Sequence, residues 1–431
     1  MKYSKIEQDR FEQFIDGLSL AAVRKGIRSF DRILLGLPGV YPTQALASVQ
    51  RLVSQGEISE EIWTDAVTQT RYGRCPENPL VPSALGGKVR VSLPLPHPLD
   101  YDWRFGDRSS FHLLRKCEEL TDPEDCIALL GSPSVLARAF ERGYNRRIIL
   151  LEGNIEVTDC LSSIAPHGSV ISCDVTGDKL PDISAKAVMC DPPWYMEHFK
   201  SFLWAASRLC TAGGYLLLSA PPDGTRPNIR KEWAEVLNWA SQLGFDLLSV
   251  DNGRLPYVSP PFERNALRAE GLHHVPHEWR CSNLALFVKK RRSKVPRPSM
   301  CNSENNWSEE VFQGVRVRFR KNDRRGFRDP RLKSIVPGDV LPSVSRWDDR
   351  RKRADVWTSG NRIFQCDQPE LIRNIVWSLA SGRSPQDEVL RHLGRALTEI
   401  ENSLVEEASE QVKNIMNIEW EECENYRKEG L

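Results

Sequence analysis

A run of four residues, Asp191-Pro192-Pro193-Trp194, brings together a carboxylate, two prolines and an indole ring. The run follows the apolar residues 187–190, which predict a buried strand, and ligands of open α/β sheets bind beyond the carboxyl ends of the strands. Asp191 and the backbone carbonyl of Pro192 can accept hydrogen bonds from an exocyclic amine, which raises the electron density on its nitrogen. Trp194 can stack on a planar base, and the two prolines stiffen the loop and carry no N–H group. The alternative interpretation is a strand-ending turn with a packed tryptophan.

Three further strand ends carry residues suited to an adenosyl sulfonium ligand. The turn Gly131-Ser132-Pro133-Ser134 follows a predicted strand and opens a helix, so the backbone can approach a ligand and the helix N-terminus favours a carboxylate. Glu152 ends the next predicted strand, about 20 residues further on, where an acidic residue accepts ribose hydroxyls. Asp174 ends the third strand and could accept an adenine amine. We therefore expect Gly131, Ser132, Ser134, Glu152 and Asp174 to bind a cofactor; the alternative for each acid is a solvated strand end.

The elements that must position these residues alternate between strands and helices over residues 96–290. Apolar runs predict strands at 126–130, 148–152, 169–174, 187–191, 214–219, 245–250 and 283–288, and helical spacing predicts helices at 134–142, 198–210 and 233–243. This alternation predicts a Rossmann-like α/β sheet. Residues 252–262 are expected to form a long loop that could select the substrate.

Three other segments flank this sheet. Residues 1–95 predict a helical, winged-helix-like domain that ends in an arm over 74–100, with a small helical packing module as the alternative. Residues 291–366 predict a basic, strand-containing region that opens with a basic linker at 291–298, and residues 367–431 predict C-terminal helices. The C-terminal part is thus expected to be an α+β region that ends in helices.

The flanking segments also carry the expected partner surfaces. Residues 316–353 hold 14 Lys and Arg against 5 Asp and Glu, with Phe319 and Trp347 interleaved and Trp357 four residues beyond. This region, with the N-terminal domain, could bind nucleic acid by holding its phosphate backbone; a solvated or protein-docking face is the alternative. The C-terminal helices could bind a protein partner or self-associate, although an acidic helix is more often a solvated face.

Composition excludes several classes of protein. A chain of 431 residues suggests two to four domains, and a net charge of +1 gives no whole-chain footprint for nucleic acid. No apolar run is long enough to cross a membrane and the first residues are too polar for a signal peptide, so a cytoplasmic location is expected. The eleven cysteines form no C-x-x-C pair, and His273, His274 and His277 are interpreted as ordinary loop residues, so no metal is expected.

About 190 residues of the central segment resemble a class I S-adenosylmethionine-dependent methyltransferase. The run Asp191-Pro192-Pro193-Trp194 resembles the catalytic box of amino-methyltransferases, which methylate exocyclic amines of adenine or cytosine, or a glutamine amide. The resemblance implies that this box holds the target nitrogen, and that Gly131, Glu152 and Asp174 bind S-adenosyl-L-methionine. The turn at Gly131 departs from the aromatic-x-Gly-x-Gly loop of that family.

The order of an N-terminal domain, an arm, a Leu-Leu-Gly turn and this box is also similar to the branched-chain polyamine synthase family. Those proteins transfer an aminopropyl group from decarboxylated S-adenosylmethionine to spermidine, and residues 98–105 resemble the entry into their catalytic domain. That family carries a Gly-Asp-Asp-Asp run where this chain has Gly131-Ser132-Pro133-Ser134, and a polycationic amine needs such acids.

The sequence therefore predicts a transferase, namely an S-adenosylmethionine-dependent methyltransferase acting on an exocyclic amine, with a nucleobase in DNA or RNA as the expected acceptor. An aminopropyltransferase that uses decarboxylated S-adenosylmethionine is the first alternative. A catalytically inactive methyltransferase-fold scaffold that binds nucleic acid or a protein partner is the second.

Overall fold

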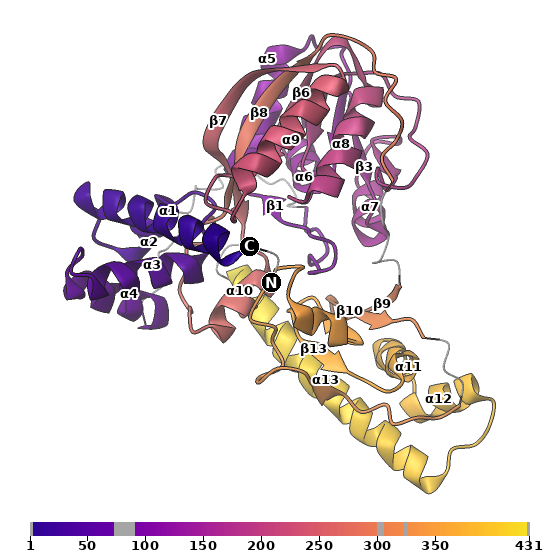
Figure 1. Cartoon of the computed structure of the whole chain (residues 1–431). Coiled ribbons are helices and arrows are strands. Elements are labelled where there is room, and N and C mark those ends of the chain that lie inside the picture. Colours follow the sequence, from indigo (N-terminus) through magenta and orange to yellow (C-terminus); the bar gives the residue numbers. More distant parts are fainter. Residues whose placement is uncertain (1–2, 73–90, 300–305, 323–325, 429–431) are drawn as a thin grey trace. The chain divides into compact units, whose positions relative to one another are not determined.

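The computed structural model describes residues 3–72, 91–299, 306–322 and 326–428, which form two compact units (Figure 1). The first unit comprises residues 1–94, 103–259 and 274–301, and the second comprises residues 95–102, 260–273 and 302–431. Within the described ranges, none of the helices combines the length and the apolar character that a membrane span requires.

The first unit is built on an eight-stranded sheet with the order β1-β7-β8-β6-β5-β2-β3-β4. Strands β2, β3, β4, β5 and β6 run parallel in the spatial order 3-2-1-4-5 of doubly wound sheets, and β8 is antiparallel to β6 and to β7. The predicted Rossmann-like α/β fold is thus confirmed. The strands are β1 (Arg104–Phe105), β2 (Ile127–Leu130), β3 (Ile148–Glu152), β4 (Val170–Ser172), β5 (Ala185–Cys190), β6 (Cys210–Ala220), β7 (Phe245–Val258) and β8 (Cys281–Lys289).

Helices cover both faces of this sheet. Helices α5 (Asp107–Leu120), α6 (Pro133–Glu141) and α7 (Ile155–Ser162) pack on one face, and α8 (Met196–Leu209) and α9 (Ile229–Gln242) pack on the other (Figure 1). Every residue of β2 is buried, which explains why its sequence is an apolar run and not an alternation of apolar and polar residues. Burial of each Leu or Ile side chain in such a layer stabilises the fold by roughly 1.5–3 kcal/mol.

Strand β7 differs from the prediction. It continues to Val258, so Asn252 and Gly253 lie within a strand and the expected long loop at 252–262 is wrong. The pairing of β7 with β8 shifts register twice, between Leu247 and Ser249 and between Asp251 and Leu255, and Gly253 has a φ of 59°. These bulges interrupt the alternation that would have marked a strand in the sequence. Residues from 261 onward form helix α10 (Pro261–Ala269) in the second unit.

The N-terminal part of the first unit is helical. It consists of α1 (Lys5–Arg24), α2 (Phe30–Leu35), α3 (Pro42–Ser54) and α4 (Glu60–Tyr72). Residues 3–72 contain no strand, so the hairpin of a winged helix stays a prediction. Most of the predicted arm at 74–100 falls on residues 73–90, which lie outside the described part of the chain.

The second unit is the predicted α+β region ending in helices. Its five-stranded antiparallel sheet has the order β11-β13-β12-β10-β9, and β10 coincides with the strand expected around Phe319. The helices bury apolar residues such as Ile375 and Val412 against that sheet. The elements are β9 (Trp307–Phe312), β10 (Val315–Arg320), β11 (Lys333–Ser334), the 3₁₀ helix η1 (Asp349–Arg353), β12 (Val356–Thr358), β13 (Ile363–Gln365), α11 (Pro369–Ala380), α12 (Pro385–Leu393) and α13 (Glu399–Lys428).

Candidate active site

The carboxyl ends of the central strands bring several predicted residues to one edge of the sheet. Leu130 is in register with Leu151 of β3 and Cys190 of β5, and Cys190 is in register with Leu218 of β6. The residues that come next, Gly131, Glu152, Asp191 and Ser219, therefore lie at this edge. The chain order reverses between β2 and β5, and such a switch point is where open α/β sheets bind ligands.

Asp191 is held by two hydroxyl donors from neighbouring strands. The hydroxyl of Tyr257 donates to Oδ1 of Asp191 at 2.6 Å, and the hydroxyl of Ser219 donates to the same oxygen. Both donors are buried, with Ser219 fully inaccessible and Tyr257 2% exposed. Burial, and then the neighbouring carboxylate, raise the pKa of Tyr257 well above its usual range, so the phenol stays protonated and remains a donor.

Neither of these donors was predicted from the sequence. Ser219 ends a predicted strand beside the one that carries Asp191, which is the only signal it offers. Tyr257 lies in the part of β7 that was expected to be a loop.

The rest of the box forms one wall beside this carboxylate. Pro192 is buried, whereas Pro193 and Trp194 are partly exposed. The Trp194 ring meets the Tyr257 ring edge to face, with 5.8 Å between centroids, and the Trp194 carbonyl accepts a hydrogen bond of 2.6 Å from Arg226. The Pro193 carbonyl accepts from the backbone N–H of Tyr195 at 2.6 Å and is used inside the turn.

A second aromatic group surrounds Arg280 next to the box. The Arg280 guanidinium carbon lies 5.9 Å from the Trp194 ring centroid, 5.0 Å from that of Trp103 and 4.7 Å from that of Trp279. The Trp279 ring in turn meets Tyr41 of the N-terminal helices at 5.5 Å. The N-terminal helices thus reach the aromatic residues that border this site.

The turn after β2 approaches Asp191 closely. Gly131 has a φ of 64°, and a Cβ at that position would lie 3.1 Å from Cε1 of Phe202 and 3.4 Å from the backbone oxygen of Asp191. Ser132 and Ser134 are buried, and the Ser132 hydroxyl donates to the carbonyl of Leu130 at 3.4 Å. Helix α6 begins at Pro133, directly after this turn, and the positive end of its dipole there favours an anion.

Glu152 and Asp174 lie at adjacent strand ends. Oε1 of Glu152 accepts from the backbone N–H of Asn154 at 2.9 Å, and Glu152 pairs with Ser172 across the two strands. Asp174 is exposed, and its Oδ1 accepts from both the N–H and the hydroxyl of Thr176 at 2.8 and 2.7 Å. A Cβ on Gly153 would lie 3.4 Å from Cα of Asp174, so the glycine lets the two loops pack together. Two carboxylates side by side suit a ligand with hydroxyl and amine donors.

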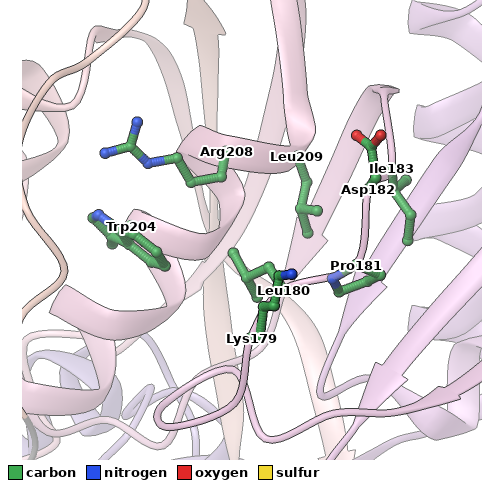
Figure 2. Close-up of a pocket in the computed structure, with 8 residues that line it drawn as sticks. All are labelled: Lys179, Leu180, Pro181, Asp182, Ile183, Trp204, Arg208 and Leu209. Atoms are coloured by element: carbon green, nitrogen blue, oxygen red, sulfur yellow. The ribbon is translucent and has the colours of Figure 1, made fainter.

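Other features of the first unit lie away from this edge. Figure 2 shows a surface hollow lined by residues 179–183, which precede β5, and by Trp204, Arg208 and Leu209 at the end of α8. These residues belong to the amino-terminal side of β5, opposite to Asp191. Within the described parts of the chain, no three His, Cys, Asp or Glu side chains gather in a way that could hold a metal ion.

The basic linker at 291–298 is attached to the first unit. Arg297 donates to the carbonyls of Val175 and Gly177 at 2.7 and 3.0 Å, and Trp204 donates to the carbonyl of Val295 at 3.1 Å. Arg208 adds a bond of 2.7 Å to the same Val295 carbonyl. These contacts hold the end of the linker, at Val295 and Arg297, against the first unit.

The expected nucleic-acid surface is only partly available. Phe319 and Trp357 are buried in the second unit, 0% and 1% exposed, so the expectation that they form part of a nucleic-acid surface is wrong. Arg316 is also buried, where it pairs with Asp100 at 2.7 Å and with Glu309 at 2.5 Å. Trp347 is 47% exposed and lies 4.5 Å from the Arg346 guanidinium, so it remains accessible.

Comparison with known proteins finds similarity in structure. No family model and no curated protein matches the chain. The branched-chain polyamine synthase from Thermus thermophilus, in complex with N4-aminopropylspermidine and 5'-methylthioadenosine, has 15% identity and a TM-score of 0.46, covering 66% of this chain and 89% of that one. A putative RNA methyltransferase from Pyrococcus horikoshii has 16% identity and a TM-score of 0.33, covering 46% and 90%. A 16S rRNA methyltransferase from Thermus thermophilus, in complex with AdoMet and guanosine, has 17% identity and a TM-score of 0.30, covering 52% and 51%.

Proposed function

We propose that the first unit is an S-adenosylmethionine-dependent methyltransferase that acts on an exocyclic amine of a nucleobase. The observation that carries this proposal is the position of Asp191 at the switch point of the sheet, with Oδ1 held by Ser219 and Tyr257 and with Trp194 beside it. A carboxylate at the end of a strand and next to an aromatic ring is suited to a planar molecule with an N–H donor.

The cofactor residues are assigned to the adjoining strand ends. The backbone around Gly131, Ser132 and Ser134 would receive the carboxylate of the ligand at the start of α6, where the helix dipole favours negative charge. Glu152 would accept the ribose hydroxyls and Asp174 the adenine amine. When bound, S-adenosylmethionine supplies an electrophilic methyl carbon on a sulfonium.

The four residues of the box are assigned to the acceptor. The carboxylate of Asp191 and the carbonyl of Pro192 would accept the two N–H bonds of the amine, which leaves the nitrogen lone pair directed at the donor. Trp194 would stack on the ring that carries the amine, and the Pro192-Pro193 turn would keep the box rigid. Most of the rate then comes from orientation and from removal of water around the nitrogen. The proton lost after transfer can pass to Asp191 or to water.

The partner surfaces are part of the same proposal. A nucleic-acid acceptor could be held in the region 316–353 through accessible groups such as Arg346 and Trp347. The N-terminal helices of the first unit could also bind nucleic acid. The C-terminal helices carry the half-exposed side chains of Ile418 and Trp420, which could bind a protein partner or a second copy of the chain.

Transfer of a radiolabelled methyl group tests the role of Asp191. We expect the wild-type protein to label single-stranded RNA or DNA oligonucleotides, and Asp191→Ala to lose at least about a hundredfold in rate because the acceptor amine loses its orienting carboxylate. Binding of S-adenosylmethionine should stay nearly intact in this variant. Asp182→Ala, at an exposed carboxylate on the opposite side of β5, is the matched control and should keep full activity.

Equal loss of transfer and of cofactor binding in Asp191→Ala would contradict the assignment, because it would make Asp191 a cofactor or structural residue. Transfer of an aminopropyl group from decarboxylated S-adenosylmethionine to spermidine would favour the polyamine alternative.

A further inference from the structure

Tyr257 connects three parts of the candidate active site. Its hydroxyl donates to Asp191 at 2.6 Å. Its ring meets the Trp194 ring edge to face, with 5.8 Å between centroids, and stacks on the Phe105 ring, with 4.5 Å between centroids and 19° between the planes. Its backbone is held as well, because its N–H donates to the carbonyl of Arg280 at 2.8 Å. The residue is therefore fixed at the ring, at the hydroxyl and at the main chain.

We infer that Tyr257 is the positioning residue of the reaction, which fixes the carboxylate of Asp191 and the ring of Trp194 in one geometry. This inference rests on the proposed function, since it assigns the acceptor side of that site. Tyr257 acts through Asp191 and Trp194 and takes no part in bond making.

The physical argument begins with the two hydroxyl donors. A hydrogen bond to a carboxylate favours its ionised form and restricts the rotation of its plane. The Ser219 hydroxyl can rotate about its own bond, whereas the Tyr257 hydroxyl lies in the plane of a ring that Phe105 and Trp194 hold from two sides. Of the two donors, Tyr257 is therefore the one that sets the direction of the carboxylate.

Ring packing and hydroxyl chemistry can be separated by substitution. Tyr257→Phe keeps the stacking on Phe105 and the contact with Trp194 and removes one hydrogen bond to a charged group. A smaller side chain at position 257 is avoided, because Tyr257 is buried and loss of its ring would leave a cavity beside Phe105 and destabilise the fold. Tyr215→Phe is the matched control, since Tyr215 lies on β6 in register with Ala187, four residues before Ser219 and away from the strand end next to Asp191.

The first measurement needs no turnover. The carboxyl carbon of Asp191 is titrated by nuclear magnetic resonance in protein labelled at aspartate, and assigned from Asp191→Asn. We expect the midpoint to move upward by about 1 to 2 pH units in Tyr257→Phe, as one lost hydrogen bond to the ionised form requires, and to stay in place in Tyr215→Phe. An unmoved midpoint in Tyr257→Phe would overturn the inference, whatever the activity of the protein.

The second measurement is the pH–rate profile of methyl transfer. Tyr257→Phe should lower kcat by about tenfold, leave the dissociation constant of S-adenosylmethionine unchanged, and move the acidic limb of the profile to higher pH. A uniform loss at every pH, together with weaker cofactor binding, would show a structural role only and overturn the inference. If the wild-type protein shows no transferase activity but the Asp191 midpoint still moves in Tyr257→Phe, the proposed function is rejected. The contact between Tyr257 and Asp191 is then still established.

Discussion

Gly131 has a left-handed backbone conformation and also lacks space for a side chain. Its φ of 64° is unfavourable for a side chain, and a Cβ would lie 3.1 Å from the Phe202 ring. Gly168 shares the conformation, with a φ of 83°, but a Cβ there would meet nothing within 4 Å. The pair therefore separates backbone strain from steric conflict in one protein.

We expect Gly131→Ala to destabilise the fold more than Gly168→Ala. Both variants lose about 1 kcal/mol from the left-handed backbone conformation, and Gly131→Ala loses about 1 kcal/mol more because Phe202 must move. It should also weaken binding of S-adenosylmethionine, since the turn would be displaced. Urea unfolding and calorimetric titration measure the two effects, and equal unfolding free energies for the two variants would argue against a tightly packed turn.

Among the individual residues of the site, the sequence predicted those that belong to a recognisable motif or lie near a strand end. The box at Asp191 follows an apolar strand, Glu152 ends β3, and Asp174 lies two residues after the end of β4; apolar runs in the sequence predicted these three strands. Ser219 and Tyr257 could not be predicted as partners of Asp191, because a lone hydroxyl has no pattern and 28 and 66 residues separate them from the carboxylate.

At the scale of elements, Lys289 joins the ends of two helices. This buried residue at the end of β8 donates to the carbonyl of Ser207 in α8 and to that of Leu243 after α9, both at 2.9 Å. Carbonyls at helix ends lack partners within the helix, and a cation there is favoured by the helix dipole. Burial nevertheless lowers the pKa of Lys289 to about 8.

The lowered pKa predicts a dependence of stability on pH. Between pH 8 and about 10.5 the unfolded chain holds a proton on Lys289 that the folded chain lacks, so the contribution of this group to the unfolding free energy falls as pH decreases across that window. We expect the unfolding free energy of the wild type, minus that of Lys289→Met, to rise by about 2 kcal/mol from pH 7.5 to pH 9.5.

Urea unfolding at the two pH values measures this difference. The exposed neighbour Lys290, changed to Met, is the control and should give the same difference from wild type at both pH values. A difference for Lys289→Met that is constant or falls with pH would contradict the lowered pKa.

The elements themselves were largely predictable, and β7 shows why one was not. The parallel strands and the helices α6, α8 and α9 follow from apolar runs and helical spacing. The second half of β7 contains Asn252-Gly253 and Pro256, residue types that normally mark turns. Pairing with β8 outweighs these local preferences, and no local pattern in the sequence records that pairing.

At the scale of the whole molecule, the chain forms two units, and a buried acid helps to hold the second together. Glu419 of α13 is fully buried and accepts from the Gly360 N–H at 3.0 Å, from Arg362 at 3.3 Å and from the Thr358 hydroxyl. Burial raises the pKa of Glu419, and these donors oppose that shift. The network attaches the C-terminal helix to the turn between β12 and β13.

We expect Glu419→Ala to destabilise the second unit by about 2 kcal/mol. The change leaves the Gly360 N–H without its acceptor and removes one of the two acids beside Arg362, while Glu422 still pairs with that arginine at 2.7 Å. Glu421→Ala, exposed on the same helix, should change little. Because all proposed cofactor residues lie in the first unit, S-adenosylmethionine binding should be the same in both variants; lost binding in Glu419→Ala alone would contradict this assignment.

Folding of the second unit buries part of the basic region at 316–353, and the sequence alone did not predict this burial. The alternating Val and Arg residues at 315–320 were correctly expected to form a strand. Arg316 is buried beside Glu309 of the adjacent strand β9 and beside Asp100, which is distant in sequence, and both carboxylates compensate its charge. A count of charges in one segment therefore overestimates the surface that is available to a nucleic acid.

The most direct test of the central claim is calorimetric binding of S-adenosylmethionine and of its decarboxylated form to the purified wild-type protein. The proposed site predicts saturable binding with a preference for the form that carries the carboxylate, because α6 begins next to Gly131 and the turn contains no acid to receive an amine in its place. A preference for the decarboxylated form would contradict the methyltransferase assignment in favour of aminopropyl transfer, and binding of neither compound would contradict the cofactor site itself.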